Sequence, residues 1–166
     1  RRKARLVTLL QERHRDILVE MASIMYDSGG IGLAAPQVGL IESMIVVDIG
    51  KGLYKLVNPV IVKKSGSQQM EEGCLSVPGV CINIQRAQEV LVQALDDSAK
   101  PVEIKAEGLF ACVLQHEIDH LRGKLIVDHA SIFDKLRIKG ILNELKKRSA
   151  YEFVSEPKDK SCRLQL

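Results

Sequence analysis

The chain has 166 residues, a length typical of one domain with a proper hydrophobic core. Its charged fraction of 27% and apolar fraction of 46% are those of an ordinary globular protein, and a net charge of +3 is too small to indicate nucleic-acid binding by itself. No apolar run reaches the length that is needed to cross a membrane.

The four cysteines lie at irregular intervals and form no Cys-x-x-Cys pair. This spacing excludes a zinc knuckle and a thioredoxin-type redox motif. An even number of cysteines leaves disulfides open, but no other feature indicates secretion, so we expect a reducing compartment.

Residues 1–15 are rich in Arg and Lys and poor in acidic residues. Because no initiator Met is present, we expect processing or trimming upstream; the basic start is either a transit-peptide remnant or, as we prefer, the solvated start of a helix. From about Gln11 the apolar residues follow helical spacing, and residues 27–30 contain strong breakers. We predict a helix between these points, with Met21 and Met25 as core residues rather than metal ligands.

Residues 30–39 are mostly small and present one polar side chain, Gln37. The segment lacks the Gly-Lys-Ser/Thr of a phosphate loop and the third glycine of a dinucleotide fingerprint. Small residues let a backbone approach a ligand closely. Gln37 is therefore either a donor to an oxyanion or part of a purely structural loop, and the segment alone does not decide between them.

Runs of apolar and β-branched residues predict the strands of a sheet. We expect these strands over residues 44–48, 54–62, 89–95 and 102–105. Asn58-Pro59 is expected to break the second strand, and residues 63–67 are expected to form a turn. Residues 71–79 form another compact stretch, and residues 96–101 form the turn between the last two strands.

The most informative motif is Gln115–Leu121, which contains His-Glu-x-x-His. On a helix, His116 and His120 lie on one face about 5–6 Å apart and can bind one metal ion, while Glu117 lies beside them and can transfer protons. An apolar lead-in and the breaker Gly123 predict a helix over residues 107–122. The alternative is an ordinary core helix whose histidines are only hydrogen-bonded, but the motif favours a metal site.

Ser131 is a suitable N-cap for a last, amphipathic helix. Its apolar residues are Phe133, Leu136, Ile141, Leu142 and Leu145, and its basic ones are Lys135, Arg137, Lys139, Lys146, Lys147 and Arg148. No repeat or linker divides the chain.

A catalytic metal site needs a third protein ligand and one open position. His129 follows the helix too closely for the extended metalloprotease pattern, which would place a histidine at Ile126. The remaining choices are a downstream acid or Cys74, which lies in the compact stretch. The acids are Asp128, Asp134 and Glu144.

Three separated motifs resemble those of the peptide deformylase family, in the family's order and at roughly its spacing. They are residues 30–37, 72–76 and 115–121, and the resemblance spans about residues 16–148. It implies an α+β fold with antiparallel β-sheets around a central metal-binding helix, followed here by the C-terminal amphipathic helix. We therefore predict a single catalytic domain over residues 1–150 and a polar tail over 151–166.

The resemblance also implies an activity, removal of the N-formyl group from the formyl-methionine of new polypeptides with release of formate. Cys74, His116 and His120 would bind one divalent metal ion, Fe²⁺ in cells with Zn²⁺, Ni²⁺ or Co²⁺ as replacements. Glu117 would transfer protons, while the Gln37 amide and the Leu75 backbone N–H would stabilise the oxyanion. The expected substrate-binding residues are Ile31, Gly32, Gly73, Cys112 and Val113.

Further expectations concern the surroundings of the site. Glu72 and Arg86 could pair and brace the Cys74 segment. The family usually has an N-terminal strand with Pro-Asp and Leu-Arg, but this pattern is not found in residues 1–15. The sequence therefore does not predict how that edge of the sheet is formed.

The expected partners are formyl-Met nascent peptides, with no membrane and no DNA. The basic face of the last helix either contacts the ribosome or is simply solvated, and we give these two interpretations equal weight. We expect the bacterial cytoplasm, with an organelle as the alternative.

Two other functions fit part of the pattern. An ordinary zinc endopeptidase would use a downstream histidine or acid as its third ligand. An RNA-binding domain with a structural metal would need four protein ligands, of which we can name three, and would leave Glu117 without a role.

Overall fold

The structure, a computed structural model, describes residues 2–151. Apart from Tyr151, the predicted tail over 151–166 lies outside the described residues. The chain order is α1 (Glu12–Asp27), β1 (Gly32–Ala34), the 3-10 helix η1 (Ala35–Val38), β2 (Met44–Val47), β3 (Tyr54–Ser65), β4 (Gln68–Cys74), β5 (Val77–Arg86), β6 (Glu89–Leu95), β7 (Pro101–Glu107), α2 (Gly108–Leu121), the 3-10 helix η2 (Ile126–Asp128) and α3 (Ile132–Tyr151). No described helix is both long and apolar enough to cross a membrane.

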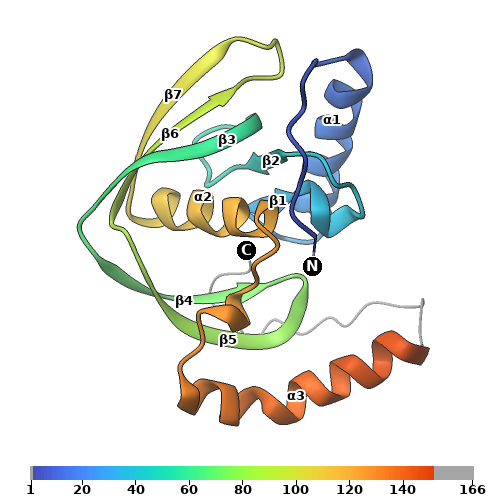
Figure 1. The fold of residues 1–166 in the computed structure, drawn as a ribbon, viewed down its shortest axis with the longest axis vertical. Coiled ribbons are helices and arrows are strands. Elements are labelled where there is room, and N and C mark those ends of the chain that lie inside the picture. The colour runs from blue at the N-terminus through green and yellow to red at the C-terminus, as the bar shows by residue number, and fades with distance from the viewer. Residues whose placement is uncertain (1, 152–166) are drawn as a thin grey trace.

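The strands form two antiparallel sheets, which confirms the predicted α+β fold. Five strands pair in the order β1-β2-β3-β6-β7, and β4 pairs with β5 in a separate hairpin. Figure 1 shows that β3 and β6 lead from the larger sheet toward this hairpin, so that α2 lies between the two sheets. The predicted metal helix is therefore enclosed from both sides.

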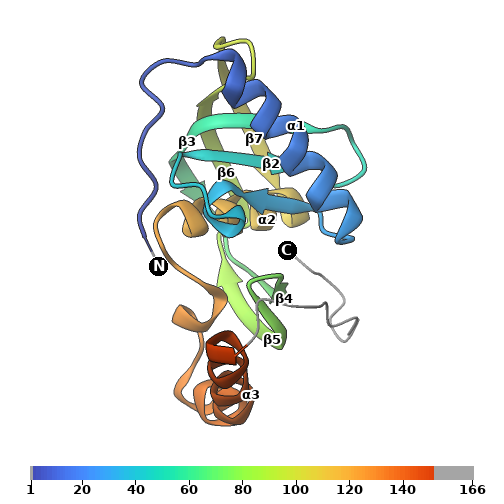
Figure 2. The same cartoon turned by 90° about the vertical axis from the view of Figure 1, so that its right-hand side faces the viewer.

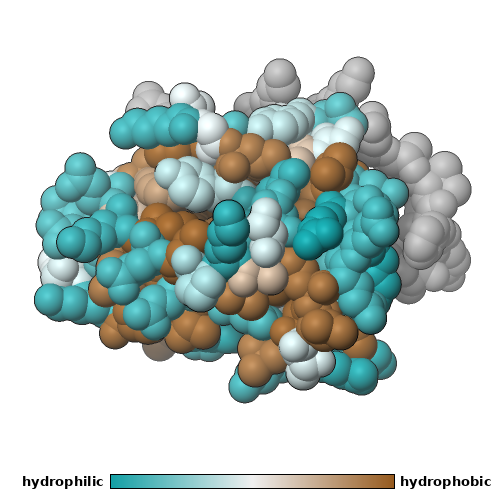
Figure 3. All heavy atoms as spheres, turned by 90° about the horizontal axis from the view of Figure 1, so that it is seen from above, coloured by the Kyte–Doolittle hydropathy of each residue, from teal (hydrophilic) through white to brown (hydrophobic). Residues whose placement is uncertain are grey.

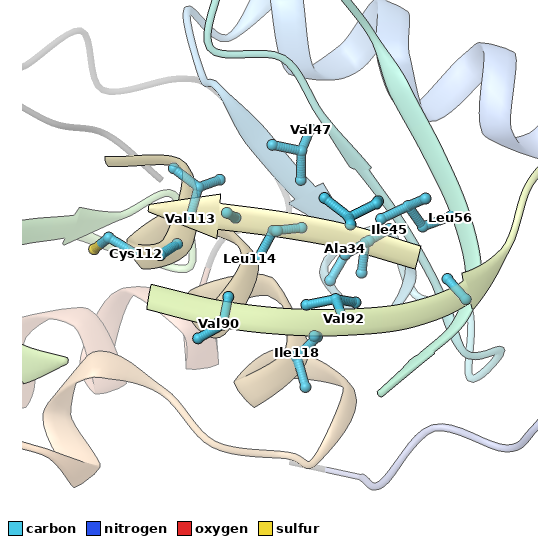
Figure 4. Close-up of a cluster of buried hydrophobic side chains, with 14 of the residues drawn as sticks. Ala34, Ile45, Val47, Leu56, Val90, Val92, Cys112, Val113, Leu114 and Ile118 are labelled. Carbon is cyan, nitrogen blue, oxygen red and sulfur yellow. The ribbon is translucent and has the colours of Figure 1, made fainter. Parts of the chain in front are cut away.

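The larger sheet is covered on both faces, as Figure 2 shows for α1 and α2. Val46 and Met44 point into a cluster with Met21 and Met25 of α1, as predicted for those two methionines. Ile45 belongs to the opposite cluster, which α2 completes with Cys112, Val113, Leu114 and Ile118 (Figure 4). Strand β2 is buried at every position because side chains alternate between two covered faces.

The strand predictions need two corrections. The predicted break at Asn58-Pro59 is a bulge inside a continuous β3, where Asn58 has a φ of +53° and its side chain bonds the backbone N–H and carbonyl of Val7. The predicted turn over residues 63–67 is also wrong, because Lys63 to Ser65 pair with β6 and the chain reverses only at Gly66, with a φ of +64°. Cross-strand bonds thus extend β3 past its own breakers.

The basic start is extended rather than helical. Arg5 N–H bonds the carbonyl of Ile41 at 2.7 Å, and Ser43 N–H bonds the carbonyl of Arg5 at 2.8 Å. The preferred expectation of a helical start is therefore wrong before Glu12, because this segment pairs with a distant backbone. The stretch over residues 71–79 is the β4–β5 turn with its flanking strand ends.

Helix α3 begins as predicted, with the Ser131 hydroxyl accepting the Asp134 N–H at 3.1 Å. It packs on the β4–β5 hairpin through Ile138, Leu142 and Leu145. Phe133 is 84% exposed, so the apolar residues of this helix do not form one buried stripe. Helical spacing places positions 138, 142 and 145 on the side of α3 that contacts the hairpin. The first turn of the helix, which contains Phe133, lies outside this contact. On the face seen in Figure 3, polar and apolar side chains are interspersed.

The core between α1 and the sheet can be tested at Met25, which is 0% exposed. We expect Met25→Ala to lower the free energy of unfolding by about 2–5 kcal/mol, because it removes buried apolar atoms and leaves a cavity. The matched control is Ile24→Ala on the same helix, at a side chain that is 43% exposed. Equal losses in urea denaturation for the two variants would contradict this packing.

Candidate metal centre

Three side chains from two parts of the chain converge between α2 and the hairpin. Cys74 ends β4, and His116 and His120 lie one helical turn apart on α2. All three are buried, and their ligand atoms lie within 4.8 Å of one another. The Nε2 atom of His120 lies 3.2 Å from the Cys74 Sγ and 3.1 Å from the His116 Nε2.

A buried carboxylate determines the tautomer of His116. The Nδ1 atom of this ring lies 2.8 Å from Glu72 Oε2. Burial by itself raises the pKa of Glu72, but the hydrogen bonds from Arg86 and His116 outweigh it and hold the pKa at about 2. Because an ionised carboxylate only accepts hydrogen bonds, the hydrogen of His116 lies on Nδ1 and the lone pair of Nε2 points at Cys74 and His120.

The other two ligand atoms suit a cation equally well. Burial lowers the pKa of His120 to about 3, so this ring is neutral. Burial raises the pKa of the Cys74 thiol to about 12, against hydrogen bonds from Ser76 that lower it, so binding a metal ion would release its proton. The Nε2 atoms of the two imidazole rings lie 3.1 Å apart, close enough for both to bind one cation. One sulfur and two nitrogens suit Zn²⁺, Fe²⁺, Co²⁺ or Ni²⁺.

Glu117 is the second indication of a reactive site. Its side chain is 0% exposed, and neither carboxyl oxygen has a hydrogen-bond partner among the described residues. Burial, followed by the nearby charge of Glu72, raises the pKa of Glu117 well above its ordinary value. A Cβ atom at Gly32 would collide with this carboxyl group, so only glycine leaves room for it. Burying a polar group without a partner costs free energy. Such a cost is common for a side chain that takes part in a reaction rather than in folding.

Gln37 is oriented by its own backbone. Its Oε1 accepts the Ala34 N–H at 2.7 Å, which turns the amide nitrogen toward the hairpin, 3.3 Å from Ser76 Oγ and 4.0 Å from Cys74 Sγ. The two interpretations of the segment are therefore compatible, because one end of the side chain holds the loop and the other offers a donor at the site.

Among the predicted substrate-binding residues, Gly73 directly precedes Cys74 and Gly32 lies against the Glu117 carboxyl group. Gly32 and Gly73 are buried, and Ile31 is half-buried with its carbonyl accepting the Asp48 N–H at 3.0 Å. Cys112 and Val113 are 0% exposed on α2 (Figure 4), and the Cys112 thiol donates to Glu72 Oε1 at 3.2 Å. Leu75 follows Cys74 in the turn.

The other candidates for the third ligand have different roles. Asp128 accepts the Leu125 N–H, and Asp134 bonds Ser131 at the start of α3. Glu144 is exposed. Among the described residues, Cys74 is therefore the side chain that completes a cluster with His116 and His120.

The expected Glu72–Arg86 pair is present, with Arg86 Nε and Nη2 donating to the two carboxyl oxygens at 2.7 and 2.9 Å. Sequence reasoning missed the next partners. Arg86 Nη1 donates to Asp119 Oδ2 at 2.6 Å, and His129 lies 2.8 Å from the same oxygen. Asp119 stands directly before His120 in the sequence, and this position was the only hint of its role. Nothing in the sequence indicated which groups it contacts.

Comparison with known proteins places these observations in one family. A sequence profile of the family described as polypeptide deformylase matches residues 1–136. A peptide deformylase of Pelotomaculum thermopropionicum is 44% identical over 134 residues, which cover 81% of this chain and 86% of that protein. One from Syntrophomonas wolfei is 51% identical over 114 residues, covering 69% of this chain and 75% of that protein.

Solved structures agree with the sequence comparisons. A peptide deformylase from Legionella pneumophila superimposes with a TM-score of 0.83 at 42% identity and covers 92% of each chain. One from Arabidopsis thaliana, solved with an inhibitor, gives a TM-score of 0.85 at 34% identity and covers 96% of this chain and 92% of that one.

The buried carboxylate of Glu72 makes the stability of the protein depend on pH in the acidic range. Its pKa of about 2 lies below its ordinary 4.5, so its stabilisation is complete above about pH 5 and is lost as the pH falls through about 2. We expect the free energy of unfolding of the metal-free protein, relative to that of Glu72→Gln, to fall by about 3 kcal/mol over this range. Urea denaturation of both proteins across pH measures the difference, and a difference that does not change with pH would disprove the assignment.

Proposed function

The chain belongs to the peptide deformylase family, whose members are metal-dependent hydrolases that remove the N-formyl group from nascent peptides, and from this premise we propose which of its residues carry out each step. The observation that carries the proposal is the convergence of Cys74, His116 and His120 beside the unpartnered carboxyl group of Glu117. We propose residues 1–150 as the single catalytic domain.

Cys74, His116 and His120 are the residues that would hold one divalent ion, Fe²⁺ in cells with Zn²⁺, Ni²⁺ or Co²⁺ as replacements. When bound, the ion supplies a Lewis acid that polarises the formyl group and lowers the pKa of water in the site. The protein contributes the orientation of the ligands, because Glu72 keeps the hydrogen of His116 away from the metal side of the ring.

Glu117 is the proton carrier in this proposal. Its carboxylate takes a proton from the attacking water while the water oxygen bonds to the formyl carbon. It then gives that proton to the departing amine nitrogen as the C–N bond breaks, which yields formate and a free amino terminus. Its raised pKa suits this role, because a carboxylate with a raised pKa accepts a proton from water more readily and holds it until the amine departs.

Two donors would stabilise the oxyanion that develops on the formyl oxygen. They are the Gln37 side-chain amide, which is turned toward Cys74, and the backbone N–H of Leu75. One donor of this kind is typically worth about 2.7–4 kcal/mol in the transition state. Gln37 thus contributes to the rate without binding the metal.

We propose that the peptide lies along β1, which is the edge strand of the larger sheet. Ile31, Gly32 and Gly73 would contribute backbone hydrogen bonds, as an edge strand offers unpaired groups to a partner. The Ile31 carbonyl already accepts the Asp48 N–H, so Ile31 would offer its N–H. Cys112 and Val113, in the turn before His116, would wall the methionine side chain.

The decisive variant is Glu117→Gln, which keeps the size of the side chain but cannot carry the proton. We expect full metal content, determined by elemental analysis, and formate release from a formyl-Met peptide that is lower by about 10²–10⁴-fold. Stability should not fall, because the variant replaces an unpartnered carboxyl group. Cys74→Ala serves as the comparison that loses the metal. A metal-loaded Glu117→Gln protein with wild-type turnover would refute the role.

We also propose that α3 contacts ribosomal RNA in the bacterial cytoplasm, where formylated chains emerge; an organelle remains the alternative location. Lys135 and Lys139 are exposed on this helix, and cationic patches bind RNA with an affinity that falls as salt rises. The double variant Lys135→Glu, Lys139→Glu should co-sediment less with ribosomes at low salt while keeping its turnover of short formyl peptides. The control is Lys51→Glu, far from α3 in the chain. Binding that is equal for all proteins, or independent of salt, would refute the contact.

A further inference from the structure

A continuous chain of polar contacts leads from a metal ligand to the segment before α3. His116 Nδ1 lies 2.8 Å from Glu72, which accepts from Arg86 Nε at 2.7 Å. Arg86 Nη1 donates to Asp119 Oδ2 at 2.6 Å, and His129 Nε2 lies 2.8 Å from that same oxygen. Four elements therefore meet in one network, since Glu72 lies on β4, Arg86 on β5, Asp119 on α2 and His129 directly after η2.

The inner part of the network is shielded from water. The side chain of Glu72 is 0% exposed and that of Arg86 is 5% exposed, while Asp119 and His129 are 13% and 28% exposed. Buried charges must be paired, and removing one partner leaves the other uncompensated. Arg86 spans both carboxylates with its planar fork, so a change at Asp119 reaches Glu72 through one rigid side chain.

Asp119 joins the outer residues of the network. Its Oδ2 atom accepts a hydrogen bond from Arg86 Nη1 and lies 2.8 Å from His129 Nε2. Because a carboxylate paired with an arginine only accepts hydrogen bonds, His129 Nε2 is the donor of the second bond.

We infer that Asp119 and His129 are positioning residues of the metal centre, which hold Arg86 so that Glu72 keeps His116 in the orientation and tautomer that bind a metal. The inference rests on the metal centre of the proposed function. His129 acts from outside the catalytic helix, through Asp119 and Arg86, and ties the metal ligand to the segment that leads into α3.

The test compares metal retention in matched variants. His129→Leu removes the donor, His129→Gln restores an N–H donor at a similar reach, and Asp119→Asn removes the charge. Lys124→Gln, an exposed position in the same connection, is the control. Each protein is loaded with cobalt(II), its visible absorption spectrum is recorded, and the rate of metal release to a chelator is measured, together with its folding by circular dichroism.

We expect His129→Leu and Asp119→Asn to release cobalt about 10–100 times faster than wild type and to shift the cobalt spectrum. His129→Gln and Lys124→Gln should stay within about threefold of wild type. A purely structural contact would change stability but leave the spectrum of the folded protein unchanged.

A folded His129→Leu protein with the wild-type spectrum and release rate overturns the inference, and so does a His129→Gln protein that is as impaired as His129→Leu. If His129→Leu does not fold, Asp119→Asn decides in the same way, since wild-type spectrum and release in that variant also overturn it. Failure of the wild type to bind cobalt would instead refute the metal centre itself, so the two ideas fail separately.

Discussion

The ion pair between Glu72 and Arg86 is the interaction on which the rest of the site depends. Glu72 is fully buried and Arg86 almost so, so each charge is tolerated only because the other is present. Both lie on the β4–β5 hairpin, and an isolated two-stranded hairpin is at best marginally stable in water. The pair reaches α2 through His116 and Asp119, which places the hairpin, and with it Cys74, against the helix.

Helix α2 can serve as the centre because its middle is buried all round. A helix that is apolar on most faces must be enclosed, and here the larger sheet encloses one side and the hairpin the other. Leu114 and Ile118 pack into the sheet cluster, while His116 and His120 face the hairpin. The same helix thus supplies core packing and two of the proposed metal ligands.

The buried, unpartnered carboxyl group of Glu117 lowers the stability of the folded protein. A sequence selected only for folding would place an apolar residue at a position that is 0% exposed with no hydrogen-bond partner among the described residues. Gly32 makes the room that this group needs. Glu117 breaks the rule that buried polar groups are hydrogen-bonded, whereas Glu72 and Arg86 nearby obey it. Such exceptions are expected at functional sites.

The sequence by itself determined the features that depend on neighbours a few residues apart. The paired histidines one turn apart, the core face with Met21 and Met25 and the Ser131 cap all follow from helical spacing and local hydrogen bonds. The tertiary structure decided what depends on distant partners. Asn58 is held in a bulge by Val7, Arg5 pairs with a distant backbone, and Asp119 is joined to His129 and Arg86. Periodicity shows which face of an element is buried, but not which element buries it, because that choice is made by contacts between residues far apart in the chain.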